Sequence, residues 1–302
     1  MNSLLSITDI KDDVKYILDL AIKIKAGEME DKPLEGKTLA MIFQKSSTRT
    51  RVSFDVGMYQ LGGRAIFLSS NDLQMGRGEP ISDTAKVLSR FVDGIMIRAI
   101  KHSDVVELAK HSDVPVINGL TDLEHPCQAL ADVLTIKEHL GDWEGKKICF
   151  VGDGNNVSNS LLLIAPLLGM DMSVACPKGY EPCEDILKTA LEYADENNTK
   201  ITITDDIGFA LQNVDAVFTD VWVSMGDEAE KAKREIDFAP FQVNSDLMSL
   251  ANDGAIFLHC LPAVRGQEVS AEVIDGPQSV VFDEAENRMH AQKAVLYYYM
   301  KD

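Results

Sequence analysis

Hydroxyl and guanidinium side chains are concentrated in the stretch "QKSSTRTRVSF", residues 44–54. They directly follow the apolar run "TLAMIF", residues 38–43, which predicts a buried strand. Ser47 can cap a helix, because the residues after it return to helical spacing. A helix N-terminus offers free backbone N–H groups and positive potential, and Arg49 can add a two-pronged cation. The pattern suits an anion site; an ordinary capped helix with solvated arginines is the alternative that this stretch alone leaves open.

A second polar group stands in "HPCQALAD", residues 125–132. Pro126 suits the first turn of a helix, so His125 would precede that helix and Gln128 would lie one turn further on. Together the two side chains suit recognition of a planar carbonyl or amide group, and a structural histidine is the alternative. We expect no metal here, because no second histidine or carboxylate stands at ligand spacing.

Two adjacent asparagines, Asn155 and Asn156, occur in "VGDGNNVSNS", residues 151–160. The stretch resembles a dinucleotide-binding turn, but Val157 stands where the third glycine of that fingerprint belongs. Asn155 and Asn156 instead offer amide groups at a strand-to-helix turn, which suits a small carboxylate. Two ordinary turn asparagines are the alternative.

An acidic group follows a strand-like run in "DVWVSMG", residues 220–226. Asp220 could hold a substrate ammonium group, and a capping aspartate before a surface loop is the alternative. The residues from Ser224 to Gly226, with the acidic stretch 227–237, suggest a mobile loop.

A cysteine stands beside a Leu–Pro bond in "HCLPAVRG", residues 259–266. A nucleophilic cysteine needs a basic partner, and strand alternation would turn His259 to the opposite face from Cys260. We therefore predict that Cys260 lines a pocket and is not half of a Cys–His catalytic pair.

Strand-like runs alternate with helical patterns along the whole chain, which predicts an α/β fold with mostly parallel sheets flanked by helices. In such sheets ligands bind beyond the carboxyl ends of the strands, where the polar groups above are found. The predicted strands cover residues 38–43, 64–69, 94–98, 115–118, 147–152, 172–176, 201–204, 216–220, 255–260 and 279–282.

The length of 302 residues favours two domains. A helix should end at Gly141, and a polar turn precedes the next strand. We predict one domain over residues 1–141, a second over residues 142–284, and a C-terminal helix over residues 285–302 that packs back on the first domain.

The composition and charge of the chain argue against a membrane or a nucleic acid as its partner. The composition, with 45% hydrophobic and 25% charged residues, is that of a globular protein. No apolar run approaches the ~20 residues that span a bilayer, and the N-terminus lacks a basic region followed by an apolar one. We therefore expect a cytoplasmic protein with no membrane partner. The formal charge of −19 argues against binding nucleic acid. The five cysteines form no CxxC motif and are expected to be reduced thiols.

Taken in chain order, "SSTRTR", "HPCQ", "DVWVSMG" and "HCLPA" resemble the carbamoyltransferase family, and within it the members that act on ornithine. The resemblance covers essentially the whole chain. Members that use aspartate usually carry "HPLPR" at the last motif, whereas Cys260 and Ala263 stand here, and Asp220 is negative where aspartate would need a positive charge. The resemblance implies two domains with the active site in the cleft between them, no cofactor, and a homotrimer or a higher assembly of trimers.

The resemblance also implies the reaction. The carbamoyl group of carbamoyl phosphate passes to the δ-amine of L-ornithine and gives L-citrulline and phosphate, in arginine biosynthesis or in the reverse, catabolic direction. The first domain would bind carbamoyl phosphate and the second ornithine. Leu261–Pro262 would be a candidate cis peptide, and Arg51, on another side of the helix from Arg49, would be structural.

Roles for individual residues follow from the same resemblance. Those implied to bind carbamoyl phosphate are Ser47, Thr48, Arg49, Thr50, Gln74, Arg98, His125, Gln128, Cys260, Leu261 and Arg288. Those implied to bind ornithine are Asn156, Asp220, Ser224 and Met225. The implied catalytic residues are Thr50, Arg98, His125 and Cys260.

Three other functions remain open. A related carbamoyltransferase acting on putrescine would not need Asn156 or Asp220. A dinucleotide-dependent oxidoreductase would explain the parallel sheets, but its glycine pattern is broken. A non-catalytic binding paralogue would be expected to have lost some of the pocket groups, and none is missing.

Overall fold

The protein forms two compact units. The computed structural model describes residues 3–29, 32–70, 73–223 and 228–301. The first unit comprises Met1–Ala131 and Glu286–Asp302, and the second comprises Asp132–Ala285. The division lies inside helix α5 (Pro126–Leu140), whereas the sequence pattern predicted a boundary after that helix, at Gly141. The C-terminal segment belongs to the first unit.

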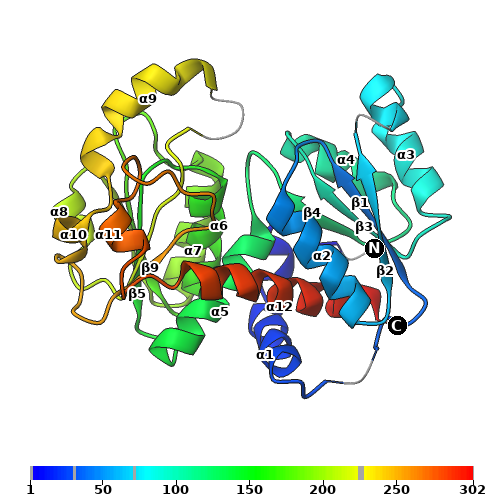
Figure 1. The fold of residues 1–302 in the computed structure, drawn as a ribbon, viewed down its shortest axis with the longest axis horizontal. Coiled ribbons are helices and arrows are strands. Elements are labelled where there is room, and N and C mark those ends of the chain that lie inside the picture. Colours follow the sequence, from blue (N-terminus) through cyan, green and yellow to red (C-terminus); the bar gives the residue numbers. More distant parts are fainter. Residues whose placement is uncertain (1–2, 30–31, 71–72, 224–227, 302) are drawn as a thin grey trace. The chain divides into compact units, whose positions relative to one another are not determined.

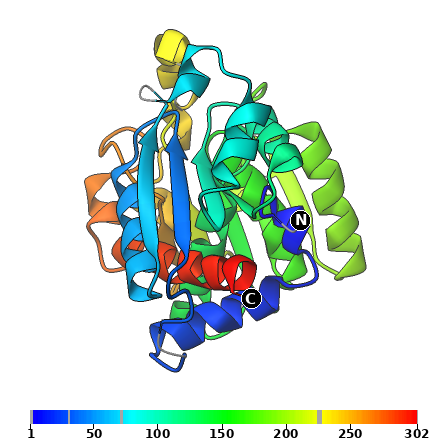
Figure 2. The ribbon, with the colours of Figure 1, turned by 90° about the vertical axis from the view of Figure 1, so that its right-hand side faces the viewer.

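The first unit is built on a four-stranded parallel sheet in the order β2-β1-β3-β4 (Figure 1). Figure 2 views the ribbon from the side and shows β1 and β2 lying next to each other. The strands are β1 (Thr38–Phe43), β2 (Arg64–Ser69), β3 (Gly94–Arg98) and β4 (Val116–Leu120). The helices are η1 (Ile7–Ile10), α1 (Val14–Lys25), α2 (Thr48–Gln60), η2 (Gln74–Arg77), α3 (Ile81–Leu88) and α4 (His102–His111).

The second unit is built on a five-stranded parallel sheet in the order β7-β6-β5-β8-β9. The strands are β5 (Lys147–Val151), β6 (Asp171–Ala175), β7 (Ile201–Thr204), β8 (Ala216–Phe218) and β9 (Ile256–Leu258). The helices are α6 (Asn156–Leu167), α7 (Glu184–Glu196), α8 (Ile207–Ala210), η3 (Glu228–Glu230), α9 (Lys231–Asp237), η4 (Ala239–Phe241), α10 (Ser245–Met248) and α11 (Ala271–Ile274). The last helix of the chain is α12 (Val281–Met300).

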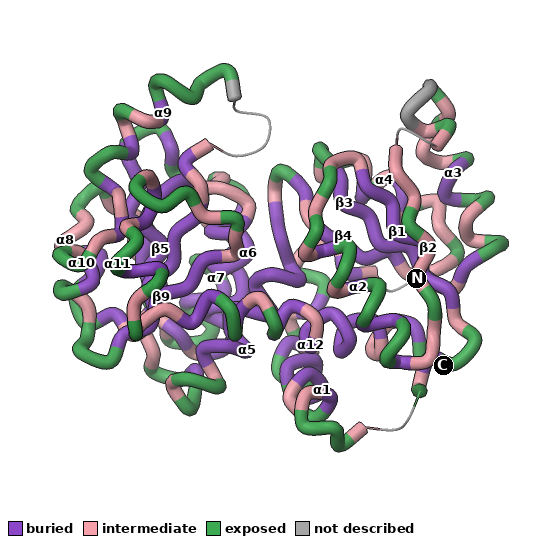
Figure 3. Tube along the Cα trace, viewed as in Figure 1, coloured by how far each residue is buried: buried purple, intermediate pink, exposed green. Residues whose placement is uncertain are grey.

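Each sheet has an apolar core of its own. In the first unit Ile42, Ile95 and Val105 belong to one buried cluster, and every residue of β1 and β3 is buried (Figure 3). In the second unit Val151 and Phe257 belong to another. Burial on both faces explains why these strands read as continuous apolar runs, as is usual for parallel sheets. Within the described ranges, no helix is long and apolar enough to cross a membrane.

The two parallel sheets confirm the predicted fold class, but one predicted strand is wrong. In the run of residues 279–282, Ser279 makes only an isolated bridge to Phe257, and α12 already begins at Val281. Short apolar runs do not distinguish a strand from a buried helical turn. Asp283 and Glu284 decide for the helix here, because acidic side chains stabilise a first helical turn.

The acidic stretch of residues 227–237 was predicted as a mobile loop, and this is wrong for its second half. Lys231–Asp237 form helix α9, and Arg234 within it is buried. The residues Ser224–Gly226 of the same prediction lie outside the described residues.

Candidate active site

The first polar group gathers at the start of α2. Strand β1 ends at Phe43 and α2 begins at Thr48, with Ser47 as its cap. The Ser47 hydroxyl accepts a hydrogen bond from the Thr50 backbone N–H at 3.3 Å and donates one to Thr50 Oγ1 at 3.1 Å. The predicted strand, turn and helix start are confirmed. The first turn of α2 therefore presents backbone N–H groups and hydroxyls at the carboxyl end of β1, which is a suitable environment for an anion.

Arg288 on α12 is the centre of a buried hydrogen-bond network in the first unit. Its Nη2 donates to Thr50 Oγ1 at 2.8 Å. Its Nη1 donates to Gln128 Oε1 and lies 3.3 Å from His125 Nε2. These four side chains come from α2, from the start of α5 and from α12, and all four are buried. The network thus brings together residues from three distant parts of the chain.

His125 is a neutral histidine in this network. Burial lowers its pKa well below the usual value, and the positive charges of Arg288, Arg98 and Arg49 lower it further. Because a guanidinium only donates, His125 Nε2 accepts from Arg288 and the ring proton lies on Nδ1. A neutral imidazole among three guanidinium groups can still polarise a carbonyl oxygen through its remaining N–H without adding a further charge.

The other predicted residues of the first unit differ in exposure. Arg98 ends β3, as predicted, and it is buried. Thr48 is exposed and Arg49 is partly buried. Gln74 lies on the short helix η2 with an exposed side chain. The structure therefore gathers Thr50, Arg98, His125, Gln128 and Arg288 in the interior of this unit, with Ser47, Thr48 and Arg49 closer to solvent.

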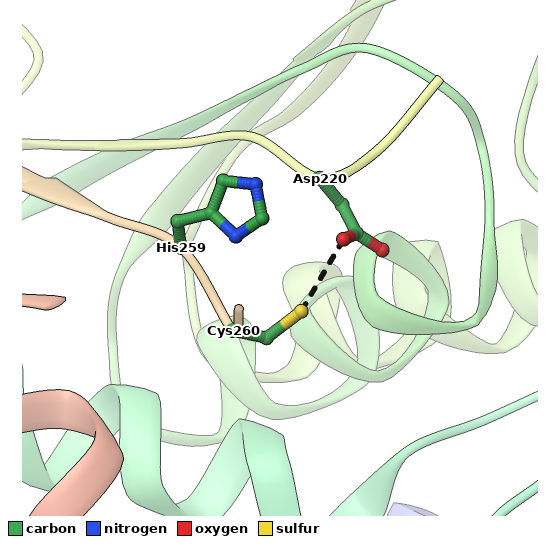
Figure 4. Close-up of side chains that lie close together, drawn as sticks. All are labelled: Asp220, His259 and Cys260. Carbon is green, nitrogen blue, oxygen red and sulfur yellow. Dashed lines mark hydrogen bonds between the residues drawn. The ribbon is translucent and has the colours of Figure 1, made fainter. Parts of the chain in front are cut away.

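In the second unit Asp220 is held by three donors. Its Oδ2 accepts from Asn155 Nδ2 at 2.8 Å. Its Oδ1 accepts from the Val221 backbone N–H at 2.8 Å and from Cys260 Sγ at 3.3 Å (Figure 4). The residue is 9% exposed. A carboxylate fixed from three directions is well placed to bind a cation in a fixed orientation.

Asn155 connects Asp220 to the turn between β5 and α6. Its Oδ1 caps α6 by accepting from the backbone N–H groups of Val157 and Ser158, so its Nδ2 is left to face Asp220. The sequence patterns singled out Asn156 for ornithine and did not assign this role to its neighbour. The usable signal was the capping preference of asparagine at a predicted helix start, which fixes the direction of its side chain.

The glycines of this turn serve the backbone itself. Gly152 has φ of +142°, and a Cβ on Gly154 would lie 2.3 Å from the backbone of Glu181 and Pro182. These contacts explain a glycine-rich turn that lacks the third glycine of a dinucleotide fingerprint.

His259 and Cys260 lie closer together than predicted. Strand β9 ends at Leu258, so strand alternation does not extend to these two residues. Ligand atoms of Asp220, His259 and Cys260 lie within 4.8 Å of one another (Figure 4), a set of possible metal ligands that the spacing of the sequence did not reveal. The geometric reason for excluding a Cys–His pair was therefore wrong.

The hydrogen bonds of His259 give a different reason for the same conclusion. Nδ1 accepts from the Leu261 backbone N–H at 2.9 Å, so the ring proton lies on Nε2, which donates to Glu268 Oε1 at 3.2 Å. Both ring nitrogens are occupied, and the Cys260 thiol donates to Asp220 instead. Burial raises the Cys260 pKa well above its usual value, and nearby negative charges raise it further, Asp220 first among them. Cys260 is a neutral hydrogen-bond donor and not an activated nucleophile.

A slow reaction of Cys260 with alkylating agents is therefore expected. With iodoacetamide at pH 7.5, Cys183, which is partly exposed like Cys260, should be modified at least about ten times faster, because the raised pKa keeps the Cys260 thiol protonated and the thiolate is the reacting species. Peptide mass spectrometry over time measures both rates, and the urea-unfolded chain serves as the control in which they should converge. Equal rates in the folded protein would contradict the protonated thiol.

Comparison with known proteins agrees with this geometry. A family model described as the carbamoyl-P binding domain of aspartate/ornithine carbamoyltransferase matches residues 2–138, and the model of the Asp/Orn binding domain matches residues 144–299. The chain belongs to the aspartate/ornithine carbamoyltransferase family.

Individual relatives extend over the whole chain. The protein is 77% identical to an ornithine carbamoyltransferase of Methanobrevibacter smithii, with 100% of both chains covered. It is 62% identical to one of Methanothermobacter thermautotrophicus, again over 100% of both. The solved structure of ornithine carbamoyltransferase from Pyrococcus furiosus is similar with a TM-score of 0.94 and 53% identity, covering 99% of this chain and 97% of that one.

Two further features bear on the carbamoyltransferase motifs. The Leu261–Pro262 peptide is cis, as the family resemblance implied, and Leu261 has a positive φ of 56°. Ser224 and Met225, predicted to bind ornithine, lie outside the described residues.

Proposed function

We propose that this protein transfers the carbamoyl group of carbamoyl phosphate to the δ-amine of L-ornithine and forms L-citrulline and phosphate. The observation that carries this proposal is the Arg288 network beside the start of α2, where cations, hydroxyls and a neutral histidine converge. A phosphate dianion with an attached carbonyl group needs this combination of charge and neutral donors. Family membership and the names of the relatives support the same reaction.

The first unit would bind carbamoyl phosphate. In this proposal Ser47, Thr48, Arg49 and Thr50 hold the phosphate at the start of α2, where the helix dipole and free N–H groups add to the arginine. The residues proposed to hold the carbamoyl part are Gln74, Arg98, His125, Gln128 and Arg288. It stays a prediction that residues 1–141 with 285–302 form the domain that binds carbamoyl phosphate and that residues 142–284 form the domain that binds ornithine.

The second unit would bind ornithine. Asp220 would pair with the α-ammonium group and Asn156 would bind the α-carboxylate, together with Ser224 and Met225. Cys260 and Leu261 would border both substrates. Asn155 joins this proposal as the residue that orients Asp220, because it donates to that carboxylate at 2.8 Å.

The chemistry would follow from the development of charge. The δ-amine attacks the carbonyl carbon, the C–O bond to phosphate breaks, and negative charge develops on the carbonyl oxygen in between. Thr50, Arg98 and His125 are the proposed donors to that oxygen, and one well-placed donor is worth roughly 3–4 kcal/mol. The departing phosphate takes the proton that the amine loses. Holding two substrates in position contributes about 7–11 kcal/mol in favourable cases.

The reaction should become faster as the pH rises. Only a neutral δ-amine can attack, and the reference pKa of such an amine is ~10.4, so the reactive fraction grows through the range from pH 6 to pH 9. His125 should add no step to this pH profile near the ordinary pKa of a histidine. Burial and three arginines keep its pKa well below that value, so the ring stays neutral. Measuring kcat/KM for ornithine across this range tests the prediction. A flat profile with rate-limiting chemistry would contradict attack by a free amine.

We also propose that the protein assembles as a homotrimer or as a higher assembly of trimers. Helix α2 exposes Val52, Val56 and Tyr59, which are spaced along one face of the helix, with Tyr59 79% exposed. Light scattering after gel filtration should give a mass of about three times 33.3 kDa, or a multiple of that mass. A single chain mass at micromolar concentration would contradict this proposal. The cytoplasmic location stays a prediction.

A competition between acceptors tests the proposed reaction. Citrulline formation from carbamoyl phosphate and ornithine should far exceed the carbamoylation of putrescine or aspartate. A preference for putrescine would be compatible with the proposed carbamoyl phosphate site but would overturn the assignment of ornithine as the second substrate. The absence of transfer to any acceptor, with carbamoyl phosphate still bound, would favour a non-catalytic paralogue.

A further inference from the structure

A buried cation in the second unit has no part in the proposed chemistry. Arg234 on α9 is 8% exposed, and its Nη1 donates to Asp153 Oδ2 at 2.7 Å and to the Trp222 carbonyl at 3.0 Å. Its Nε lies 3.4 Å from Glu230 Oε2, which is on the solvent side. One guanidinium group thus connects α9 with two other segments of the unit.

Both of those segments lead to Asp220. Asp153 stands two positions before Asn155, whose Nδ2 donates to Asp220 Oδ2. Trp222 stands two positions after Asp220. Arg234 therefore fixes the backbone on one side of Asp220 directly, through a carbonyl, and fixes the Asn155 turn through Asp153.

An aromatic cluster keeps water away from this ion pair. Tyr180, Trp222 and Phe238 form a separate buried cluster, and the Arg234 guanidinium lies 5.0 Å from the Tyr180 ring centre and 5.8 Å from that of Phe238. With little water present, the attraction between Arg234 and Asp153 is screened less than at the surface. The pair is suited to hold a fixed geometry, unlike the exposed ion pairs elsewhere on α9.

We infer that Arg234, paired with Asp153, is a positioning group for ornithine: it sets the orientation of Asp220 and thereby the affinity for the amino-acid substrate. The inference rests on the proposed function for its substrate. Arg234 does not contact the reacting atoms in this assignment. Its removal should weaken ornithine binding and leave the carbamoyl phosphate site in the first unit unchanged.

The test compares steady-state kinetics of Arg234→Lys and Asp153→Asn with the parent. Lysine keeps the charge but lacks the fork that reaches a carboxylate and a carbonyl together. Both variants should raise the ornithine KM about tenfold while kcat stays within about threefold and the carbamoyl phosphate KM stays unchanged, the pattern of lost ground-state binding. Parent-like ornithine KM values in both variants would overturn the inference.

Two matched variants separate positioning from general stability. Tyr180→Phe removes the hydrogen bond from Tyr180 to Asp237 in the same aromatic cluster but leaves Arg234 paired. Lys231→Gln removes an exposed charge from the same helix. Neither should change the ornithine KM, whatever it does to Tm. An equal rise in KM for Tyr180→Phe, at a similar loss of Tm, would reduce Arg234 to a structural role and overturn the inference.

A readout without turnover separates this inference from the proposed reaction. The chain holds two tryptophans, so in a Trp143→Phe background Trp222 is the remaining tryptophan and can be excited selectively over the tyrosines. Arg234→Lys should shift its emission to longer wavelength, because the Trp222 carbonyl loses its donor and the indole gains access to water. Unchanged emission in Arg234→Lys would overturn the positioning role. If Arg234→Lys shifts the emission but the parent protein makes no citrulline, the result counts only against the proposed reaction.

Discussion

Replacing Arg49 with alanine should lower kcat/KM for carbamoyl phosphate by about 100-fold or more. The loss would correspond to two charge-assisted hydrogen bonds to the phosphate, each worth about 1.5–3 kcal/mol. Burial, Arg288 and Arg98 lower the His125 pKa more than Arg49 does, so the variant should let this pKa rise only slightly and His125 should stay neutral. Initial rates at varied carbamoyl phosphate and saturating ornithine measure the first effect, and NMR titration of the histidine measures the second.

Arg51 provides a matched control two positions further along α2. Its guanidinium lies 3.9 Å from the ring centre of Phe67, so it stacks on β2 and does not join the Arg288 network. Arg51→Ala should keep the KM for carbamoyl phosphate within about twofold of the parent, because exposed cation–π contacts are worth about 0.5–1 kcal/mol of stability. Equal losses in the two variants would remove the phosphate role from Arg49 and point to a general need for positive charge on this helix.

Replacing Asp220 with asparagine should lower kcat/KM for ornithine by about 100-fold or more, since a buried ion pair that loses one partner costs roughly 3–5 kcal/mol. The KM for carbamoyl phosphate should change little. Putrescine lacks the α-carboxylate and is already a poor acceptor, but it keeps the second ammonium group that Asp220 would pair with, so its use should fall as well. Intact ornithine use in this variant would show that the second substrate has been assigned wrongly.

The neighbour of Asp220 allows charge to be separated from hydrogen bonding. In Asp220→Asn, the new NH2 group faces a donor, because all three partners of the parent carboxylate donate to it. Adding Asn155→Asp supplies an acceptor at that position and keeps a good cap for α6. The double variant should recover Tm but not ornithine affinity. Recovery of both would mean that the hydrogen bond, and not the position of the charge, is what ornithine requires.

Local patterns were sufficient for much of the fold. The strand before Ser47 and the helix after it follow from an apolar run and a capping residue, which act over a few residues. The same holds for Pro126 at the start of α5 and for Asn155 at the start of α6. Parallel order followed from the alternation of strands and helices, and it directed attention to the strand ends where Arg98 lies.

Contacts between distant parts of the chain could not be read from local patterns. Nothing in the sequence around Arg288 indicates that its guanidinium reaches Thr50, and only the family resemblance named it. Arg234 stands among acidic residues and looked like part of a solvated loop, although it is buried against Asp153. His259 was misplaced because β9 ends at Leu258, two residues earlier than the alternation argument needed.

The first unit is discontinuous in sequence, and this has a consequence for biosynthesis. A ribosome completes Met1–Ala131 early, but Arg288 belongs to the segment Glu286–Asp302, which is translated last. The second unit is one continuous stretch and can fold while synthesis proceeds. The bond from Arg288 to Thr50 joins residues 238 positions apart, so the proposed carbamoyl phosphate site is finished only when translation is nearly over. A nascent chain that ends at Ala285 would carry the whole second unit and remain unable to capture the labile acyl phosphate.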